Sequence, residues 1–589
     1  MTLRKVLFHR VAYKVFIIVL LFFLIYPPLS LARNVLAIKG SLRTISKSLK
    51  EGDLTAAEEI LSADKRRLKL ARRALNLMPY LQIMPVLKQQ TAVLDFLLVQ
   101  AEEILSVADD LFGLAKEVLA LPAGEVDLMT ISLDEARIIV GLADKESKFK
   151  ELSARVDKIK QNLTSFDVSN GWSELKSAHS LFLLYSEKVS NSLDKASTAS
   201  RLLPQLAGYY SSRTYLFVFQ NNTEMRPAGG FLGSYGILKL KEGEIEEFFT
   251  DDTYNLDKNF TQIITPPEPL AIYNQDKEWT FRDANWSPDF PTSSRKMLEF
   301  YRLEGGLDWQ QVDAVIALTP TVIEDLLQVL GPQRVSGYDY EFTSSNFTDQ
   351  LELHVEKTYK QIGESKEDRK SIIGKLGQQL IAKMFALPPA KLIEVLFLTE
   401  QNLEKKQILL YSLNPKEQAD LIAEGWAGEI KNTDADFLMV ADANIASLKT
   451  DLAISRYLDY RVVEAKQQLS AKLKVTYDHQ GKFDWKTTRY RTWVRVYVPL
   501  GSNLLKIKGN ESEVVTTTEL NKTVFGFFKS IEPGTKEGFE IEYLLPAGLN
   551  RDNYSLYFQK QAGIINYDLT TNLFGEVNNY NLSKDAVIR

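Results

Sequence analysis

The chain has 589 residues, which at about 150 residues per domain predicts three or four domains. Its 71 Lys and Arg residues against 76 Asp and Glu give a formal net charge of −5, so no broad basic surface for nucleic acid is expected. Cysteine is absent, which excludes disulfides, thiolate metal sites and cysteine nucleophiles. A hydrophobic fraction of 45% excludes a wholly disordered chain.

The N-terminus predicts a membrane anchor. Residues 1–14 carry four basic residues and no acidic one, and the apolar run Val15–Ala32 follows them. This run is close to the about 20 residues that a membrane-spanning helix needs. A cleaved signal peptide is the alternative, because Ser30-Leu-Ala32 resembles a cleavage site, and a buried core helix is a third interpretation. We prefer a single-pass signal anchor at 15–32 in the cell membrane, a cytoplasmic tail at 1–14 and an extracytoplasmic remainder.

Residues 33–205 predict a helical stalk or bundle. From Leu142 to Phe166 the apolar residues recur at steps of three, four and seven, and the rhythm returns from Leu175 to Val189. Heptad spacing keeps one face of a helix against a partner, so the two segments predict an antiparallel hairpin around the turn Ser169-Asn-Gly171. A bundle within one chain is favoured over an intermolecular coiled coil.

The pattern changes to alternating strands and helices over 206–465, which predicts an α/β sandwich. Expected strands are 215–219, 237–241, 245–250, 312–318 and 436–441, and expected helices are 293–303, 320–330, 348–362, 366–386 and 415–424. From 470 to 589 short alternating strands and turn residues predict a small β-sandwich. The whole is therefore a multidomain α+β chain.

A glycine-rich segment directly after the strand 215–219 is the first candidate site. Gly229, Gly230 and Gly233 permit close approach of a ligand to the backbone, and Arg226 offers a planar donor fork for a phosphate or carboxylate. The segment is neither a P-loop nor a dinucleotide-binding turn. A tightly packed glycine-rich turn without function explains it equally well.

Two further clusters carry charged side chains. Arg282, Asp283 and Asn285 precede the helix expected near Ser293, and a helix N-terminus favours anions. A helix cap with a structural Arg–Asp pair is the alternative. Asp252 lies in an acidic strand end that would suit Mg²⁺, although an ordinary polar strand end needs no function and is preferred. No other cofactor is indicated.

Three segments carry a family resemblance. NNTEMRPAGGFLGSYG, RDANWSPDFP and YRTWVRVYVPLGS resemble the bacterial family called domain of unknown function 4012, and the likeness extends over most of the chain. The family name implies no activity.

The core is also similar, more distantly, to the LytR-CpsA-Psr envelope phosphotransferases, which are membrane-anchored and bind polyprenyl-pyrophosphate glycans. The resemblance implies that Arg226 contacts phosphate and that Asp252 is catalytic and holds a metal. It also implies that Arg369, followed by Lys370, binds the ligand. Arg282 and Asp283 are the catalytic candidates that would replace in space two charged residues missing from the family pattern. Two positions depart from that pattern, because Ala228 replaces an acid and Asp251 replaces an arginine.

From these observations we expect a cell-envelope protein that binds a phosphorylated or lipid-linked glycan, with glycan transfer as its reaction if it is an enzyme. The expected partners are the lipid bilayer and a polyprenyl-phosphate-linked glycan or cell-wall polymer, and not nucleic acid. The alternative is a non-catalytic scaffold with a degenerate phosphotransferase-like fold. Convergence of Arg226, Arg282 and Arg369 on one cavity beside Asp252, with an apolar groove near Gly229–Gly236, would favour the first.

Overall fold

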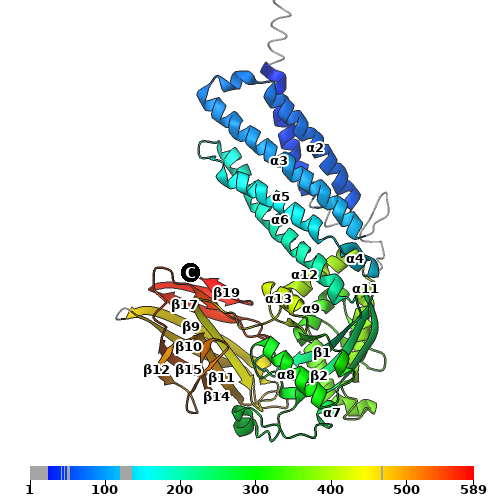
Figure 1. The fold of residues 1–589 in the computed structure, drawn as a ribbon, viewed down its shortest axis with the longest axis vertical. Coiled ribbons are helices and arrows are strands. Elements are labelled where there is room, and N and C mark those ends of the chain that lie inside the picture. Colours follow the sequence, from blue (N-terminus) through cyan, green and yellow to red (C-terminus); the bar gives the residue numbers. More distant parts are fainter. Residues whose placement is uncertain (1–23, 42, 46, 49–52, 120–134, 466–467) are drawn as a thin grey trace, which may run out of the picture. The chain divides into compact units, whose positions relative to one another are not determined.

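The computed structural model of the protein describes residues 24–41, 43–45, 47–48, 53–119, 135–465 and 468–589. The chain divides into two compact units (Figure 1). The first is formed by Met1–Ser212 with two short segments, Lys241–Glu244 and Phe385–Ile393. The second is formed by Arg213–Leu240, Ile245–Met384 and Glu394–Arg589.

The first unit is helical. Its elements are a helix over 24–41, α2 (Leu54–Asn76), the short 3₁₀ turn η1 (Pro79–Gln82), α3 (Pro85–Val118), α4 (Glu135–Leu142), α5 (Glu146–Ser165) and α6 (Ser173–Leu206). Across the described ranges, no helix combines the length and the apolar character that a bilayer crossing requires. The tail expected at 1–14 and most of the anchor expected at 15–32 lie outside the described residues.

The hairpin predicted from heptad spacing is formed by α5 and α6, which run side by side (Figure 1). Phe149, Leu152, Val156, Ile159 and Leu163 of α5 are buried in one apolar cluster. That cluster also includes residues of α3 and α6, so the heptad face is covered within the chain. The finding fits a bundle better than an intermolecular coiled coil.

The second unit contains a five-stranded sheet with the order β3-β2-β1-β4-β7. Its strands are β1 (Arg213–Asn221), β2 (Phe231–Lys241), β3 (Glu244–Asp252), β4 (Ala314–Leu318) and β7 (Ile408–Ser412). β1 runs antiparallel to β2 and parallel to β4, which is antiparallel to β7. β1 is central and mostly buried, as its unbroken apolar run predicts.

Helices cover both faces of this sheet. On one face α8 (Phe290–Leu303) packs through Met297 and Phe300 against Leu216 and Val218 of β1. The opposite face meets α9 (Pro320–Leu330), α10 (Phe347–Glu356) and α11 (Ser371–Phe385), with a cavity between them. The unit also contains α12 (Pro389–Glu404), α13 (Pro415–Ala423), the short helix α7 (Thr253–Asp257) and the two-stranded sheet β5 (Gln333–Arg334) with β6 (Glu341–Phe342).

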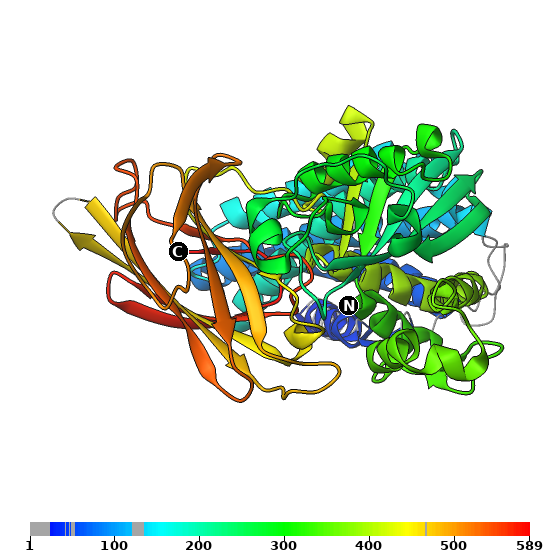
Figure 2. The same ribbon diagram turned by 90° about the horizontal axis from the view of Figure 1, so that it is seen from below.

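Two six-stranded sheets complete the second unit and share one apolar core (Figure 2). Their orders are β12-β15-β10-β9-β17-β18 and β13-β14-β11-β8-β16-β19. The strands are β8 (Asp436–Asn444), β9 (Ile454–Ala465), β10 (Gln468–His479), β11 (Tyr490–Pro499), β12 (Asn503–Lys508), β13 (Val515–Glu519), β14 (Lys522–Ile531), β15 (Lys536–Leu544), β16 (Leu556–Phe558), β17 (Tyr567–Leu573), β18 (Glu576–Leu582) and β19 (Ala586–Ile588).

The sandwich begins earlier than residue 470. β8 and β9, which the sequence analysis placed in the α/β core, pair with β11 and β10 respectively. β8 is buried along its whole length because it lies between β11 and β16 in the interior of a sheet. A buried strand has the same apolar pattern in either sheet, so its sequence does not identify its partners.

The α/β part meets the sandwich backbone to backbone at two glycines. Gly563 has a φ of +80°, and a Cβ there would lie 1.9 Å from the carbonyl oxygen of Gly229. The carbonyl oxygen of Gly563 also accepts a 3.0 Å hydrogen bond from Asn222 Nδ2. Only glycine allows both the left-handed backbone and this approach.

We therefore expect Gly563→Ala to lower the melting temperature more than Gly534→Ala does. Gly534 has a φ of +79° but no atom within 4 Å of its hypothetical Cβ, so it shares the backbone strain and lacks the clash. The overlap at Gly563 should add about 1–3 kcal/mol of destabilisation. Thermal unfolding of the two variants side by side measures this, and equal losses would show that the contact with Gly229 is loose.

Candidate functional site

A cavity of about 700 Å³ lies between the five-stranded sheet and helices α9, α10 and α11. Most of its wall is apolar, formed by Phe219, Phe231, Leu318, Ile323, Phe347, Leu351, Val355, Ile373, Leu376 and Leu380. Phe219 and Leu318 reach it because alternate residues of a strand face opposite sides of the sheet. The cavity lies where an apolar groove was expected, since Gly233 of the glycine-rich segment lines it.

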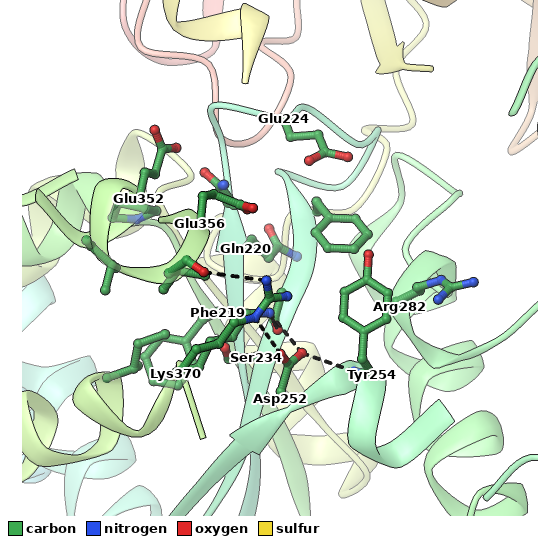
Figure 3. Close-up of a pocket in the computed structure, with 18 of the residues that line it drawn as sticks. Phe219, Gln220, Glu224, Ser234, Asp252, Tyr254, Arg282, Glu352, Glu356 and Lys370 are labelled. Carbon is green, nitrogen blue, oxygen red and sulfur yellow. Dashed lines mark hydrogen bonds and ion pairs between the residues drawn. The ribbon is translucent and has the colours of Figure 1, made fainter. Parts of the chain in front are cut away.

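The polar end of the cavity is organised by Asp252, the last residue of β3 (Figure 3). Its carboxylate caps α7 by accepting a 3.1 Å hydrogen bond from the Tyr254 amide. Lys370 Nζ lies 2.8 Å from Asp252 Oδ1 and also donates to the carbonyl oxygen of Gly233. Arg369 Nε lies 3.6 Å from the other carboxylate oxygen. Burial lowers the pKa of Lys370 against the opposing effect of Asp252.

Arg282 lies on the far side of the Tyr254 ring from Asp252 (Figure 3). Its guanidinium carbon is 5.1 Å from the centre of that ring, and its Nη1 is 3.4 Å from Asp257 Oδ2. Asp257 lines the cavity and is within hydrogen-bonding reach of Glu304, which is fully buried behind it. Burial and the nearby Asp257 raise the pKa of Glu304 to about 8, so the two carboxyl groups share a proton at neutral pH.

Three acidic side chains occupy another part of the lining. Glu224, Glu352 and Glu356 lie together across the cavity from Asp252 (Figure 3). Lys449, from the turn after β8, is 3.4 Å from both Glu224 and Glu356. The sandwich therefore contributes one cation to the cavity of the α/β part.

Arg226 takes a different position from the one that the resemblance implies. It is 3% exposed, does not line the cavity, and lies 3.0 Å from Asp283 Oδ1 and 3.5 Å from Glu224 Oε1. Its Nη1 also donates a 2.9 Å hydrogen bond to the carbonyl oxygen of Asn444 in β8. Its observed partners account for Arg226 as a structural residue that joins the glycine-rich loop to the sandwich.

The rest of that loop is packed in the same way. Asn285 is fully buried and donates a 2.6 Å hydrogen bond to the carbonyl oxygen of Gly230. A Cβ at Gly230 would lie 2.5 Å from the backbone of Asn221. The close packing at Gly229 and Gly230 matches the alternative of a tight glycine-rich turn.

The predicted residues thus separate into two groups. Gly233, Asp252, Arg282 and Arg369 line one cavity, whereas Arg226, Gly229, Gly230, Asp283 and Asn285 do not line it. Lys370 lines the cavity as well, and the structure adds Tyr254, Gln220 and Lys449 to the lining. Lys370 could be identified from the sequence as the neighbour of Arg369. No sequence pattern indicates that Lys449 lies near the residues that follow β1.

Two lining residues hold hydrogen-bond donors without a partner. Gln220 Nε2 is buried and forms no hydrogen bond, whereas the buried Nε of Arg369 faces Asp252 Oδ2 at 3.6 Å. Lys370 has three N–H groups, of which Gly233 and Asp252 engage two. Buried donors are normally satisfied, so these atoms indicate a place for an acceptor that the ligand supplies.

The residues around Asp252 do not suit a Mg²⁺ ion. Both carboxylate oxygens face cations, namely Lys370 and Arg369. In the part of the chain that the structure describes, no three His, Asp or Glu side chains are grouped as a metal site would need. A Mg²⁺ ion bound by the protein would need further oxygen ligands beside those of Asp252.

Replacing Arg226 should act on stability. Arg226→Ala leaves the buried Asp283 without its nearest cation, and breaking a buried ion pair costs about 3–5 kcal/mol. The matched control is Arg334→Ala, because Arg334 forms an exposed pair with Glu341 whose loss costs at most about 1 kcal/mol. Chemical denaturation of both variants measures these losses. An unchanged free energy of unfolding for Arg226→Ala would show that its ion pair does not stabilise the fold, and Arg226 would again be a candidate for ligand binding.

The Glu304 pair predicts a pH dependence of stability. The folded pKa of about 8 exceeds the ordinary 4.5, so wild-type stability should fall as pH rises between these values. Glu304→Gln keeps an acceptor for the Phe281 amide but cannot ionise, so the variant should lack that fall. Each unit of pKa shift corresponds to about 1.4 kcal/mol, which sets the scale of the difference.

Urea unfolding across this pH range measures the effect, with the surface variant Glu299→Gln as control on the same helix. Parallel curves for wild type and Glu304→Gln would contradict the shared proton.

Comparison with known proteins extends this description in one respect. No curated protein and no solved structure matches the chain. Residues 211–355, which run from β1 to α10 and include Asp252 and Arg282, match the model of the family described as "Protein of unknown function (DUF4012)".

Proposed function

We propose that the second unit binds a phosphorylated, lipid-linked glycan at the outer surface of the cell membrane. One observation carries the proposal: an apolar cavity of about 700 Å³ ends at a group of cations and unpartnered donors. An amphiphile with an anionic head group is the ligand class that fits both parts. The membrane location rests on the apolar run Val15–Ala32.

The apolar wall would hold the lipid chain. Transferring apolar surface from water into such a cavity is favourable by about 25 cal/mol per Å². Leu351 and Val355 of α10 and Leu376 of α11 give this part of the wall an apolar surface, while Glu352 and Glu356 of α10 belong to the acidic part of the lining. A soluble sugar phosphate would leave this surface unused.

The polar end would hold the phosphate. Gln220, Arg369 and Lys370 line the same cavity. Gln220 Nε2 has no hydrogen-bond partner, Lys370 keeps a third N–H, and Arg369 has N–H groups beyond the Nε that faces Asp252. A phosphate group offers several acceptor oxygens and favours charge-assisted bonds with Arg and Lys. Asp252 would not repel it strongly, because two cations already surround that carboxylate.

The acidic side chains across the cavity would face the glycan. Carboxylates are hydrogen-bond acceptors, and sugar hydroxyl groups are donors. Glu224, Glu352 and Glu356 lie on the lining. Lys449 is 3.4 Å from Glu224 and from Glu356, and Glu352 is 3.0 Å from Lys486. The distant LytR-CpsA-Psr resemblance adds transfer of the glycan phosphate to the cell wall as the reaction of an enzymatic protein.

A non-catalytic scaffold is the second candidate, and the position of Arg226 favours it. The cation that the resemblance assigns to phosphate is instead buried against Asp283, outside the cavity lining. A scaffold of this kind would bind its ligand without turning it over.

The binding proposal predicts that the full chain in detergent binds a polyprenyl monophosphate more tightly than the corresponding polyprenol. Leu351→Trp should fill the cavity and weaken binding at least tenfold, because the bulkier ring displaces the chain. Arg369→Gln should weaken it roughly 10- to 150-fold, since a charge-assisted hydrogen bond contributes about 1.5–3 kcal/mol. Titration with a fluorescent polyprenyl phosphate gives the dissociation constants.

Leu413→Trp is the matched control, because Leu413 is 51% exposed and does not line the cavity. It should bind as the wild type does. Equal affinity for polyprenol and polyprenyl phosphate would show that the polar end does not recognise the phosphate. Normal binding by Leu351→Trp would show that the lipid chain does not occupy the cavity.

A further inference from the structure

The position beside Asp252 has the oxygen atoms of a cation site. Asp252 Oδ1 and the carbonyl oxygen of Gly233 both accept from one ammonium group, that of Lys370. Carboxylate and carbonyl oxygens are also ligands that divalent cations take. A cation is therefore favoured at this point, and the chain itself supplies one.

We propose that the ammonium group of Lys370 takes the place of a divalent metal at Asp252 and contacts the phosphate as that metal would. The anionic head group is then held by Lys370 and Arg369, and its binding needs no Mg²⁺. This inference rests on the proposed function, because it names how the same cavity recognises its phosphate.

The fold fixes Lys370 at this point through close helix–strand packing. Lys370 directly precedes α11, whose residues Gly374 and Gly377 face β3. A Cβ at Gly374 would lie 2.3 Å from Thr250 Oγ1, and one at Gly377 would lie 3.0 Å from the ring of Phe248. Glycine at both positions lets the start of α11 approach the end of β3, where Asp252 lies.

The remaining bonding capacity of the two cations points to a ligand. Lys370 Nζ keeps one N–H after bonding to Asp252 and Gly233. Arg369 directs its Nε toward Asp252 at 3.6 Å and has four further N–H groups on Nη1 and Nη2. Arg369 Nη1 is directed by a 3.5 Å contact with the carbonyl oxygen of Val355. Asp252 thus acts as a positioning residue that orients two cations, while their free donors remain for phosphate oxygens.

Charge counting agrees with this arrangement. One carboxylate between two cations leaves a local charge of +1, and Arg282 stands beyond the Tyr254 ring, 5.1 Å from its centre. A divalent ion placed at Asp252 would be repelled by the ammonium group already bound there. A phosphate group would instead neutralise the remaining positive charge of Lys370 and Arg369.

The experiment measures binding of a fluorescent polyprenyl monophosphate to the full chain in detergent, in excess EDTA and in millimolar Mg²⁺. The wild-type dissociation constant should agree within about twofold between the two conditions. Lys370→Met should weaken binding roughly 10- to 150-fold in both, because it removes the charge and keeps the length. Lys370→Arg should keep most of the affinity without metal. Lys416→Met, at an exposed lysine that does not line the cavity, should leave affinity unchanged.

Each outcome decides between the two proposals. Wild-type binding that appears only with Mg²⁺ and disappears in EDTA overturns the inference and leaves the proposed function intact. Normal binding by a well-folded Lys370→Met variant also overturns it, since Lys370 would then be structural. If Lys370→Met does not fold, the wild-type metal series and Lys370→Arg still decide. Absence of binding in every condition refutes the proposed function instead.

Discussion

The carboxylate of Asp252 joins parts of the chain that are far apart in sequence. It ends β3, caps α7 and binds the two cations that precede α11, while Lys370 also reaches the backbone of β2 at Gly233. A carboxylate that is 3% exposed needs partners, because an isolated buried charge is costly. The polar end of the cavity and the position of α11 over the sheet both depend on this interaction.

A second buried network ties the α/β part to the sandwich. Asp451 accepts a 3.0 Å hydrogen bond from the Met225 amide and lies 2.6 Å from Arg456, which also lies 2.7 Å from Asp442. Arg226 reaches the same region through the carbonyl oxygen of Asn444. Fully satisfied networks of this kind specify a single arrangement of the segments they join. The loop after β1 is therefore held by the sandwich, and so is the turn that places Lys449 at the cavity.

The local sequence pattern predicted many of the helices and strands, but fewer of the residues at the candidate site. The strand at 215–219 and the helices at 293–303 and 320–330 agree with β1, α8 and α9, because periodicity reports burial directly. β7, β9 and α12 were not predicted, and β8 was assigned to the α/β core, because the sequence of a strand does not identify its pairing partners.

The candidate site shows the same limit in its side chains. Asp252 was a candidate because it stands at an acidic strand end, whereas Arg369 was a candidate only through the distant resemblance. Arg226 was expected at the ligand because an arginine in a glycine-rich loop has the same sequence whether it faces a cavity or the interior. Pairing with Glu224 or Asp283 was the alternative, and the structure has the guanidinium against Asp283, 57 positions away.

The segment that matches a family model ends at residue 355, but the cavity is also lined by residues that come later in the chain. Its sheet wall and Asp252 come from the matching segment, whereas Arg369, Lys370 and the apolar wall of α11 come after it. A chain that shared only residues 211–355 would keep the anchoring carboxylate and could carry a different covering helix. Under the proposed function, such a chain would keep the carboxylate that orients the cations and would differ in the helix that covers the lipid chain.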